Sequence, residues 1–373
     1  MQAKIIRNLF VIPIFINDDG PYNFVLDTGS GLTLITDSVL RTKLQLIHGT
    51  NVKVYGAGNN VPIDALLTDR LSLRIGKILS GKITVAILSQ DPFFLSSYLG
   101  IEIDGIIGYD LYSSFVVRQN SQSGQVTFYR PGRFHFTGKG DSVDISIRNL
   151  KPFVQSTLLL ENDSTKHVEL MIDTGASFPF SLDSTGSGGI PVPPKHLRVQ
   201  IGVGLSGNVF GEVARIPSIS LGKTVYQDAL CVFPDRIDSI SIRLDPGKSG
   251  SIGSELLKRY LTTFDYADKK IYLKPTLELM ESFRYNMSGM SLATGGEYSN
   301  AFVISSVEEN SPASEAGLLP NDVILEVNLT KTSEMTLDQV DGILREYEGG
   351  TLLLKVLRNK DFFYTVLHLR KLI

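Results

Sequence analysis

The stretch Phe24–Ser30 reads FVLDTGS, and a later stretch, Leu170–Ala176, reads LMIDTGA. In both, an apolar run of the kind found in strands ends in aspartate, threonine and glycine. A carboxylate at the end of such a run is costly to bury unless it is paired or takes part in chemistry. Because the triplet occurs twice, Asp27 and Asp173 are candidates to meet as partners.

Further matches at the same separation indicate that the chain contains an internal repeat. Asp27 and Asp173 lie 146 residues apart, and Gly105–Gly108 corresponds to Gly250–Gly253 at a separation of 145. The other pairs separated by 146 residues are Asp37 with Asp183, Gly56 with Gly202, Gly58 with Gly204, and Gly76 with Gly222. A run of matches at a nearly constant separation is hard to obtain by chance, so the sequence predicts two copies of one unit.

Both copies are predicted to be β-rich. Phe10–Asn17 and Tyr22–Leu26 predict a hairpin whose turn is Asp18–Pro21, and short β-like runs separated by glycine follow. Helix-like stretches are few, and the two clearest are Tyr109–Phe115 and Ser254–Leu261. The expected architecture is therefore two similar, pseudo-symmetric β lobes.

The lobes are predicted to span residues 1–135 and 136–277, and residues 281–373 are predicted to form a small α+β domain. The one clear helix of this domain begins at the capping-box pattern Thr336–Gln339 and ends at Gly349–Gly350. Its apolar positions, spaced three to four residues apart, are Leu337, Val340, Leu344 and Tyr347. The whole protein is expected to be mostly β.

Composition and charge exclude several classes of function. The 373 residues carry a net charge of −3, which gives no electrostatic reason to expect nucleic acid or an anionic membrane surface as a partner. No apolar run approaches the ~20 residues of a transmembrane helix. The single cysteine, Cys231, lies among apolar residues, and none of the five histidines has the spacing of metal ligands, so no metal or cofactor is expected.

Two aspartates at equivalent positions of pseudo-symmetric lobes can approach each other across the local two-fold axis. At close range two carboxylates share one proton, because both cannot ionise easily. Such a pair suits amide hydrolysis: the charged member takes a proton from a water, and the protonated member donates a hydrogen bond to the scissile carbonyl oxygen. Asp27 and Asp173 are therefore the predicted catalytic residues, and no covalent intermediate is required.

Six neighbouring residues are predicted to support the two carboxylates: Thr28, Gly29, Ser30, Thr174, Gly175 and Ala176. Glycine lets backbone N–H groups come close to a carboxylate, and the threonine hydroxyls can satisfy buried backbone groups where the lobes meet. Ser30 is expected to hydrogen-bond the outer oxygen of Asp27, which its counterpart Ala176 cannot do. The two carboxylates are therefore expected to be unequal in protonation.

The paired DTG triplets, each followed by a hydrophobic-Gly element, resemble the pepsin and retropepsin superfamily of aspartic peptidases. The elements are Ile106–Gly108 and Ser251–Gly253, with Ser251 where an apolar residue is usual, and the resemblance covers both lobes. It implies the acid protease fold, cleavage of peptide or protein substrates by an activated water, and a bracing role for Gly108 and Gly253. It also implies β-hairpin flaps, with ordinary tight turns as the alternative. The candidate flap residues are Tyr55, Gly56, Gly58, Gly202 and Gly204.

The C-terminal region resembles bacterial PDZ domains through Ser311–Ala313 and Ala316–Ile324, with Asn321 in place of the usual glycine. In such domains a loop before a strand offers backbone N–H groups to the C-terminal carboxylate of a peptide, which adds to the sheet as a further strand. The candidate residues of this loop are Ser288, Gly289, Met290, Ser291 and Leu292. A peptide C-terminus is the ligand that this resemblance implies.

The leading hypothesis is a single-chain, two-lobed aspartic endopeptidase whose PDZ-like domain tethers substrates, recognises C-termini or regulates access. A catalytically silent peptide-binding scaffold is the alternative, and a PDZ-like domain with a purely structural role is a third hypothesis. The kinship implies a bacterial protein that is exported or attached to the cell envelope, either periplasmic or lipid-anchored, while the cytoplasm stays open. Residues 1–17 are interpreted as a strand rather than a signal peptide, so a leader would lie outside this numbering.

Overall fold

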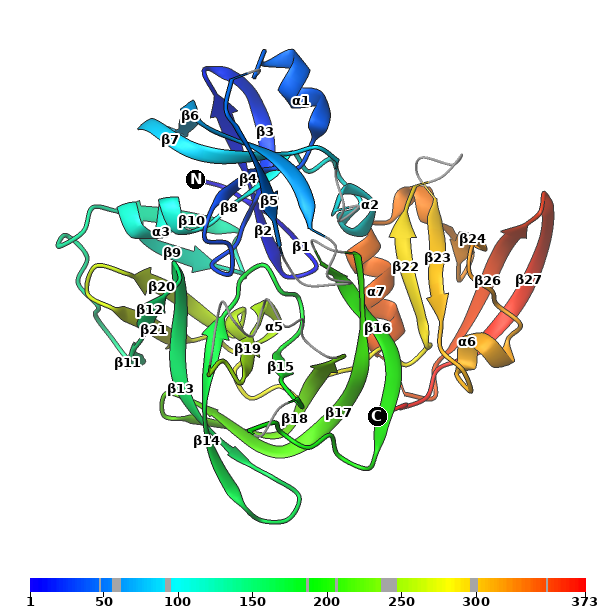
Figure 1. Ribbon diagram of the computed structural model, residues 1–373. Coiled ribbons are helices and arrows are strands. Elements are labelled where there is room, and N and C mark those ends of the chain that lie inside the picture. Colours follow the sequence, from blue (N-terminus) through cyan, green and yellow to red (C-terminus); the bar gives the residue numbers. More distant parts are fainter. Residues whose placement is uncertain are drawn as a thin grey trace. The chain divides into compact units, whose positions relative to one another are not determined.

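Figure 1 shows the computed structural model, which describes residues 1–46, 48–55, 62–90, 95–185, 188–204, 207–235, 247–295, 301–346 and 348–373. The structure is mostly β, as the sequence predicts, and its contacts divide it into two compact units. The first unit comprises Met1–Phe93, Ile103–Pro194 and Ile201–Ser282. The second unit comprises Phe94–Glu102, Lys195–Gln200 and Phe283–Ile373.

The helices and strands follow one another in a regular order along the chain. Up to residue 282 they are β1 (Lys4–Ile6), β2 (Leu9–Ile16), β3 (Asp19–Leu26), β4 (Thr33–Ile35), α1 (Ser38–Lys43), β5 (Thr50–Val54), β6 (Ile63–Ile75), β7 (Ile78–Leu88), α2 (Leu95–Leu99), β8 (Gly105–Ile107), α3 (Tyr109–Ser114), β9 (Val116–Asn120), β10 (Gln125–Tyr129), β11 (Asp141–Asp144), β12 (Ser146–Arg148), β13 (Lys151–Leu159), β14 (Thr165–Ile172), β15 (Phe180–Leu182), β16 (His196–Gly204), β17 (Gly207–Leu221), β18 (Thr224–Pro234), β19 (Gly250–Ile252), α5 (Ser254–Leu257), β20 (Tyr260–Asp265) and β21 (Lys270–Pro275). After residue 282 they are β22 (Met290–Thr294), β23 (Phe302–Val307), α6 (Pro312–Glu315), β24 (Val323–Val327), β25 (Thr330–Lys331), η1 (Thr332–Glu334), α7 (Leu337–Glu346), β26 (Thr351–Arg358) and β27 (Asp361–His368).

The two lobes of the first unit repeat one strand order. The first lobe has an eight-stranded sheet in the order β1-β2-β3-β8-β4-β7-β6-β5, and the second has β12-β13-β14-β19-β15-β18-β17-β16. In both sheets the third strand pairs in parallel with a short strand: Leu26 lies opposite Ile107, and Ile172 lies opposite Ile252. Because the orders coincide position by position, the sequence repeat is also a structural repeat.

A five-stranded sheet in the order β10-β9-β20-β21-β11 joins the lobes. Strand β9 of the first lobe pairs with β20 of the second, and Val117 lies opposite Phe264. Both side chains are fully buried, and Tyr112 of α3 packs edge-on against Phe264 with ring centroids 5.2 Å apart. The lobes therefore share one sheet and part of one core.

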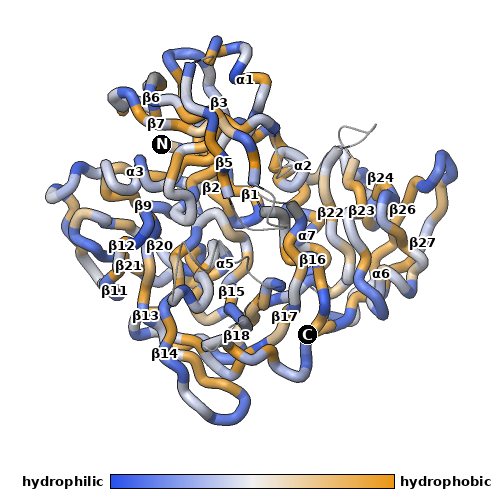
Figure 2. The backbone as a smooth tube through the Cα atoms, viewed as in Figure 1, coloured by the Kyte–Doolittle hydropathy of each residue, from blue (hydrophilic) through white to orange (hydrophobic). Residues whose placement is uncertain are grey.

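The hydropathy of the chain follows this architecture. Figure 2 shows hydrophobic residues concentrated along the strands, whereas the loop between β13 and β14 is hydrophilic. Within the described part of the chain, no helix is long and apolar enough to span a bilayer.

The first hairpin turns earlier than the predicted turn Asp18–Pro21. Strand β3 already begins at Asp19, which lies opposite Ile16, so the turn consists of Asn17 and Asp18. Both turn residues have left-handed backbone angles, with φ of 49° and 67°. Such two-residue turns match the twist of the flanking strands, which is why the shorter turn is favoured over the Gly-Pro signal.

The predicted helix Ser254–Leu261 is also shorter than expected. Helix α5 ends at Leu257, and Tyr260 already begins β20, which pairs with strands on both sides. Hydrogen bonding to two neighbouring strands outweighs the helical propensity of the sequence SELLKRYL. Helix α3, by contrast, forms within the predicted stretch Tyr109–Phe115.

The second unit has a sheet in the order β22-β23-β24-β26-β27, with β25 paired to β24. Helix α7 packs on this sheet, and its buried core residues are Leu337, Val340 and Leu344. The predicted capping box is confirmed: the N–H of Thr336 donates to Oε1 of Gln339 at 2.7 Å, and the N–H of Gln339 donates to Oγ1 of Thr336 at 3.2 Å. Tyr347, the fourth predicted apolar position, lies outside the described residues.

Candidate active site

The two aspartates lie where two equivalent strands end. Asp27 follows β3 and Asp173 follows β14, and the N–H of each aspartate continues the pairing with β8 or β19. A Cβ placed on Gly175 would lie 2.6 Å from both carboxylate oxygens of Asp27, and one on Gly29 would lie 2.8 Å from Oδ1 of Asp173. Each lobe's glycine lies against the other lobe's carboxylate, so the structure brings Asp27 and Asp173 together.

The same glycines orient the carboxylates. The N–H of Gly29 donates to Oδ1 of Asp27 at 2.7 Å, and the N–H of Gly175 donates to Oδ1 of Asp173 at 3.1 Å. A side chain at either glycine would displace a carboxylate from this position. The close approach of backbone to carboxylate explains why glycine follows threonine in both triplets.

The two threonines tie the aspartate loops to each other. The N–H of Thr28 donates to Oγ1 of Thr174, and the N–H of Thr174 donates to Oγ1 of Thr28, both at 3.0 Å. The hydroxyl of Thr28 donates to the carbonyl of Ile172 at 2.7 Å, and that of Thr174 donates to the carbonyl of Leu26 at 2.9 Å. The threonines are 0% and 2% exposed, so these four bonds satisfy groups that have no access to water.

Gly108 and Gly253 bring the chain close behind the aspartate loops. The N–H of Tyr109, which follows Gly108, donates to the carbonyl of Ser30 at 3.0 Å. The N–H of Ser254, which follows Gly253, donates to the carbonyl of Ala176 at 2.7 Å. A Cβ at either glycine would overlap backbone oxygens of these loops. Equivalent contacts therefore support both loops.

The pKa of Asp27 is raised above its ordinary value. Burial raises the pKa of Asp27 most, and the negative charge of Asp173 together with a side-chain hydrogen bond to Asp173 raises it further, to about 8. The N–H of Gly29 and the positive charge of Lys151 lower this pKa by less. Asp27 therefore keeps its proton at neutral pH, as one member of a coupled carboxylate pair does, while it retains partial access to solvent.

Two tyrosines near the pair were not predicted. Tyr112 of α3 is buried, its hydroxyl accepts a 2.9 Å hydrogen bond from Nε2 of Gln119, and its ring stacks on Tyr266 with centroids 5.6 Å apart. Burial is the largest cause that raises the pKa of both phenols, and the charge of Asp27 also raises it. The sequence contained one indication of a special role for Tyr112. The corresponding residue of the second copy, 145 residues later, is Leu257, so the repeat differs at this position.

Ser30 does not have its predicted partner. Its hydroxyl donates to the carbonyl of Leu32 at 2.7 Å, within the same loop, instead of to a carboxylate oxygen of Asp27. Short local turns of this kind compete for serine hydroxyls, and here the local turn is favoured. The raised pKa of Asp27 therefore has its main cause in burial rather than in the difference between Ser30 and Ala176.

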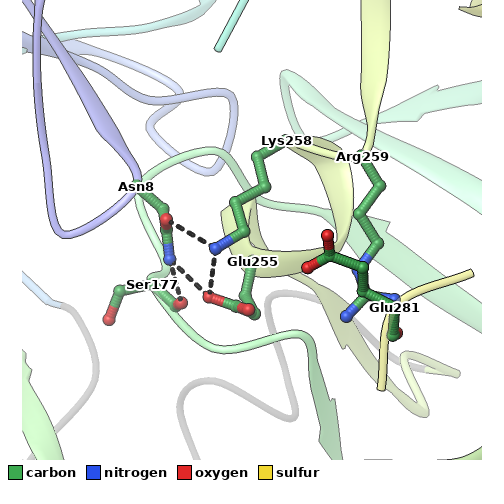
Figure 3. Close-up of polar contacts among 6 residues, drawn as sticks. All are labelled: Asn8, Ser177, Glu255, Lys258, Arg259 and Glu281. Carbon is green, nitrogen blue, oxygen red and sulfur yellow. Dashed lines mark hydrogen bonds and ion pairs between the residues drawn. The ribbon is translucent and has the colours of Figure 1, made fainter. Parts of the chain in front are cut away.

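A turn of the first lobe is held by the second lobe (Figure 3). Asn8, between β1 and β2, donates its amide to Oε2 of Glu255 at 2.7 Å and to the carbonyl of Ser177 at 3.4 Å. Nζ of Lys258 donates to Oδ1 of Asn8 at 3.2 Å and lies 3.1 Å from the same Glu255 oxygen. Ser177 follows the second triplet, so this cluster ties the first lobe to the loop that carries Asp173.

Replacing Asn8 with Ala is expected to lower the free energy of unfolding by about 2 kcal/mol, because the amide bonds to Glu255 and Ser177 are lost. The backbone of Asn8 is left-handed, with φ of 67°, and alanine tolerates this conformation poorly. Asn8→Gly is the matched control, because glycine removes the amide without the backbone strain, and about half the loss is expected. Urea denaturation followed by circular dichroism measures both; equal stability of both variants and the parent would contradict the role of the cluster.

The predicted flap residues that the structure describes are Tyr55, Gly202 and Gly204, and they lie in or next to strands of two equivalent pairs. Strand β5 pairs with β6 in the first lobe, and β16 pairs with β17 in the second. Tyr55 directly follows β5 and is 41% exposed, and Gly202 and Gly204 lie in β16. Gly56 and Gly58 lie outside the described residues. The role of these hairpins as flaps stays a prediction.

The predicted carboxylate-binding loop is shorter than the sequence indicates. Three of the five predicted loop residues lie in strand β22 instead: Met290, Ser291 and Leu292. The N–H groups of Ser288 and Gly289 donate to Oδ1 of Asn286 at 2.8 and 3.2 Å, and that of Met290 donates to Oγ of Ser288 at 3.1 Å. In this conformation the loop therefore uses these three donors itself.

Comparison with known families agrees with the two resemblances. A family model described as an aspartyl protease matches residues 12–111, and a model described as a PDZ domain matches residues 303–358. No curated protein matches the chain. The first match covers most of the first lobe, and the second lobe repeats the strand order of the first.

Proposed function

We propose that this chain, which combines an aspartyl protease region with a PDZ domain, cleaves peptide bonds by activating a water between Asp27 and Asp173. The observation that carries the proposal is the opposed placement of the carboxylates, each held by its own glycine N–H and packed against the glycine of the other lobe. The buried threonine bonds keep the two loops in register, which is the positioning that acid–base catalysis needs.

The raised pKa of Asp27 assigns the two roles. Asp27 holds the proton at neutral pH and donates a hydrogen bond to the oxygen of the scissile carbonyl. Asp173 accepts a proton from the water as the water oxygen attacks the carbonyl carbon, and Asp27 transfers its proton to the carbonyl oxygen, so that a tetrahedral diol forms. Asp173 then gives its proton to the amide nitrogen and the C–N bond breaks. A hydroxyl of the diol returns a proton to Asp27 as the carboxyl group forms, which restores the starting protonation state of the pair.

An extended peptide is the substrate class that suits the strand order. Strands β5 and β16 are the last strands of their eight-stranded sheets in the described part of the chain, and they belong to the two equivalent hairpins. A last strand can pair with an extended segment through backbone hydrogen bonds, while side-chain contacts set preference. The substrate in this proposal is therefore an extended stretch of peptide or protein.

Proteolytic profiling tests the proposal. The full chain is incubated with a diverse peptide library over a wide pH range, with and without a peptide that carries a hydroxyl-bearing mimic of the tetrahedral intermediate. Cleavage that the mimic suppresses is expected. Peptide binding without cleavage at any pH would indicate a silent scaffold instead.

The pH dependence of cleavage follows from the shared proton. Because the pKa of Asp27 is raised to about 8, the proton that hydrogen-bonds the substrate carbonyl is present below this pH and lost above it. The value of kcat/KM is expected to fall about tenfold per pH unit above pH 8. A profile measured in buffers of constant ionic strength checks this, and activity that rises steadily from pH 7 to 10 would contradict it.

A further inference from the structure

The sheet of the second unit ends at β22 in the described part of the chain, and helix α7 packs beside this strand. In PDZ domains a peptide adds to such a last strand, between the strand and the neighbouring helix. The PDZ family match covers residues 303–358, which include α7 and begin in β23. Strand β22 pairs with β23 and ends the sheet in the described part of the chain, so β22 and α7 form the expected peptide-binding edge.

A short segment that precedes β8 in sequence lies on this edge. Helix α2 packs against β22, and residues 94–102 belong to the second unit by their contacts. Oγ1 of Thr294, at the end of β22, donates to the carbonyl of Ser97 at 3.0 Å. A Cβ placed on Gly100 would lie 3.2 Å from Cγ2 of Thr294 and 4.0 Å from Cβ of Leu337, at the start of α7. The segment therefore contacts the strand of the edge and lies beside the start of the helix.

The packing of α2 is that of a docked element. Leu99 is 1% exposed, and the N–H of Gly100 donates to the carbonyl of Ser96 at 2.8 Å to close the helix. Gly100 has a left-handed backbone with φ of 73°, which is the usual helix end at glycine. The side-chain bond from Thr294 holds this helix at one end of β22.

The other end of β22 is also closed. The N–H groups of Ser288 and Gly289 donate to Asn286, and that of Met290 donates to Ser288. Asn286 in turn donates to the carbonyl of Met290 at 2.8 Å. A peptide carboxylate would have to replace these bonds. Both ends of the edge are thus occupied by groups of this chain itself.

We propose that residues 95–100 are an internal occupant of the PDZ edge, and that a peptide can add to β22 only when this segment leaves. The two separate observations that carry the proposal are α2 docked at Thr294 and the self-bonded loop at Ser288–Met290. The partner class that opens the edge is an extended peptide with a free C-terminal carboxylate. An edge that is occupied in most molecules binds such a peptide with an apparent affinity lowered by the open fraction.

The chain connection gives the displacement a route to the candidate active site, and this extension rests on the proposed function. Residues 100–104 lead from α2 to β8, which pairs in parallel with β3, the strand before Asp27. Asp104, just before β8, is buried, and Oδ2 accepts the N–H of Asn23 at 2.6 Å. Residues 100–104 thus join α2 to the strand that pairs with β3, and in this extension peptide binding is expected to change cleavage activity.

A reversible crosslink tests the proposal in the full chain. Oγ of Ser97 lies 3.4 Å from the position that a Cβ at Gly295 would take, which is within disulfide reach. The double variant S97C/G295C is therefore expected to lock α2 on β22 when oxidised and to release it when reduced. The natural cysteine, Cys231, is fully buried and does not compete.

Binding is measured with a pool of fluorescein-labelled decapeptides that have free C-terminal carboxylates and apolar last residues. The oxidised double variant is expected to bind the pool at least about tenfold more weakly than the same protein after reduction. Hydrogen exchange of residues 95–107 is expected to rise on peptide addition in the reduced form alone. Equal binding in both forms, or failure of the folded double variant to crosslink, would overturn the proposal.

A second pair of variants avoids the left-handed backbone of Gly295, whose φ is 134°. Thr294→Val removes the donor to Ser97 at nearly constant shape, and Thr294→Ser keeps it. The valine variant is expected to exchange faster over residues 95–100 and to bind the peptide pool more tightly than the serine variant. Identical behaviour of the two variants would count against docking. These readouts do not need cleavage, so a protein without peptidase activity would refute the proposed function and leave this inference standing.

Discussion

Asp27→Asn is expected to lower kcat/KM for peptide cleavage by about 10³-fold or more, because the variant loses the ionisable proton of the carboxylate pair. Asparagine has nearly the same shape, and its carbonyl oxygen can still accept the N–H of Gly29, which lies 2.7 Å from Oδ1 in the parent. The loss is therefore assigned to chemistry rather than to packing. Single-turnover cleavage of a library-derived peptide measures it.

Asp173→Asn is the matched variant, because the second lobe repeats the geometry of the first. A loss of similar size is expected, and the double variant should be little worse than either single one, since the two carboxylates act as a unit. Peptide binding with unchanged affinity shows that the substrate-binding surface of the variant is intact. Activity of either single variant within tenfold of the parent would sink the proposed mechanism.

The stability of Asp27→Asn gives an independent check on the raised pKa. The folded pKa of Asp27 lies above the reference value of 3.8, so this carboxyl contributes stability that is complete at low pH and is lost as pH rises towards about 8. The variant lacks this proton and does not share the loss. Its free energy of unfolding relative to the parent should therefore increase between about pH 4 and pH 8 and level off above; a constant difference would contradict the shift.

Thr28→Val is expected to lower the free energy of unfolding by about 2–4 kcal/mol. The hydroxyl of Thr28 accepts the N–H of Thr174 at 3.0 Å and donates to the carbonyl of Ile172 at 2.7 Å. Valine keeps the volume but leaves both backbone groups buried and unpaired, because Thr28 is fully buried. Guanidinium denaturation, with two spectroscopic probes to verify a two-state transition, measures the loss.

Thr28→Ser is the control for that prediction. Serine keeps the hydroxyl and removes one methyl group, so a loss of about 1 kcal/mol is expected. If the valine variant has a lower free energy of unfolding than the serine variant, the hydrogen bonds of Thr28 hold the loops together. The reverse order would mean that the methyl packing matters more, and the account of Thr28 and Thr174 as the tie between lobes would then be wrong.

Much of the fold could be predicted from the sequence because the residues that mark the repeat occupy positions where few other residues fit. Glycines such as Gly108 and Gly253 lie where a Cβ would overlap backbone oxygens, so their spacing marks equivalent places in the two lobes. The capping box at Thr336 likewise fixed the start of α7 from local hydrogen bonding alone. Patterns of this kind carry information because each depends on a short-range steric or hydrogen-bond rule.

Other features could not be predicted from the sequence because they depend on competition between alternative hydrogen-bond and packing partners. The sequence predicted that the hydroxyl of Ser30 bonds Asp27, and in the structure it donates to the carbonyl of Leu32 instead. The stretch after Leu257 has helical propensity, yet it joins a sheet between strands of both lobes. Tyr112 is named by no motif, and its place beside the carboxylates follows from the shared sheet.

By itself, the sequence determined that two DTG loops exist, that they are related by a repeat, and that a PDZ-like domain follows. Only the tertiary structure decided that each glycine packs against the carboxylate of the other lobe, and that burial raises the pKa of Asp27. It also placed residues 94–102 in the same unit as residues 283–373, although the two segments are far apart in the sequence. The physical reason is that motifs encode local geometry, whereas burial and cross-lobe contacts arise only once distant segments pack together.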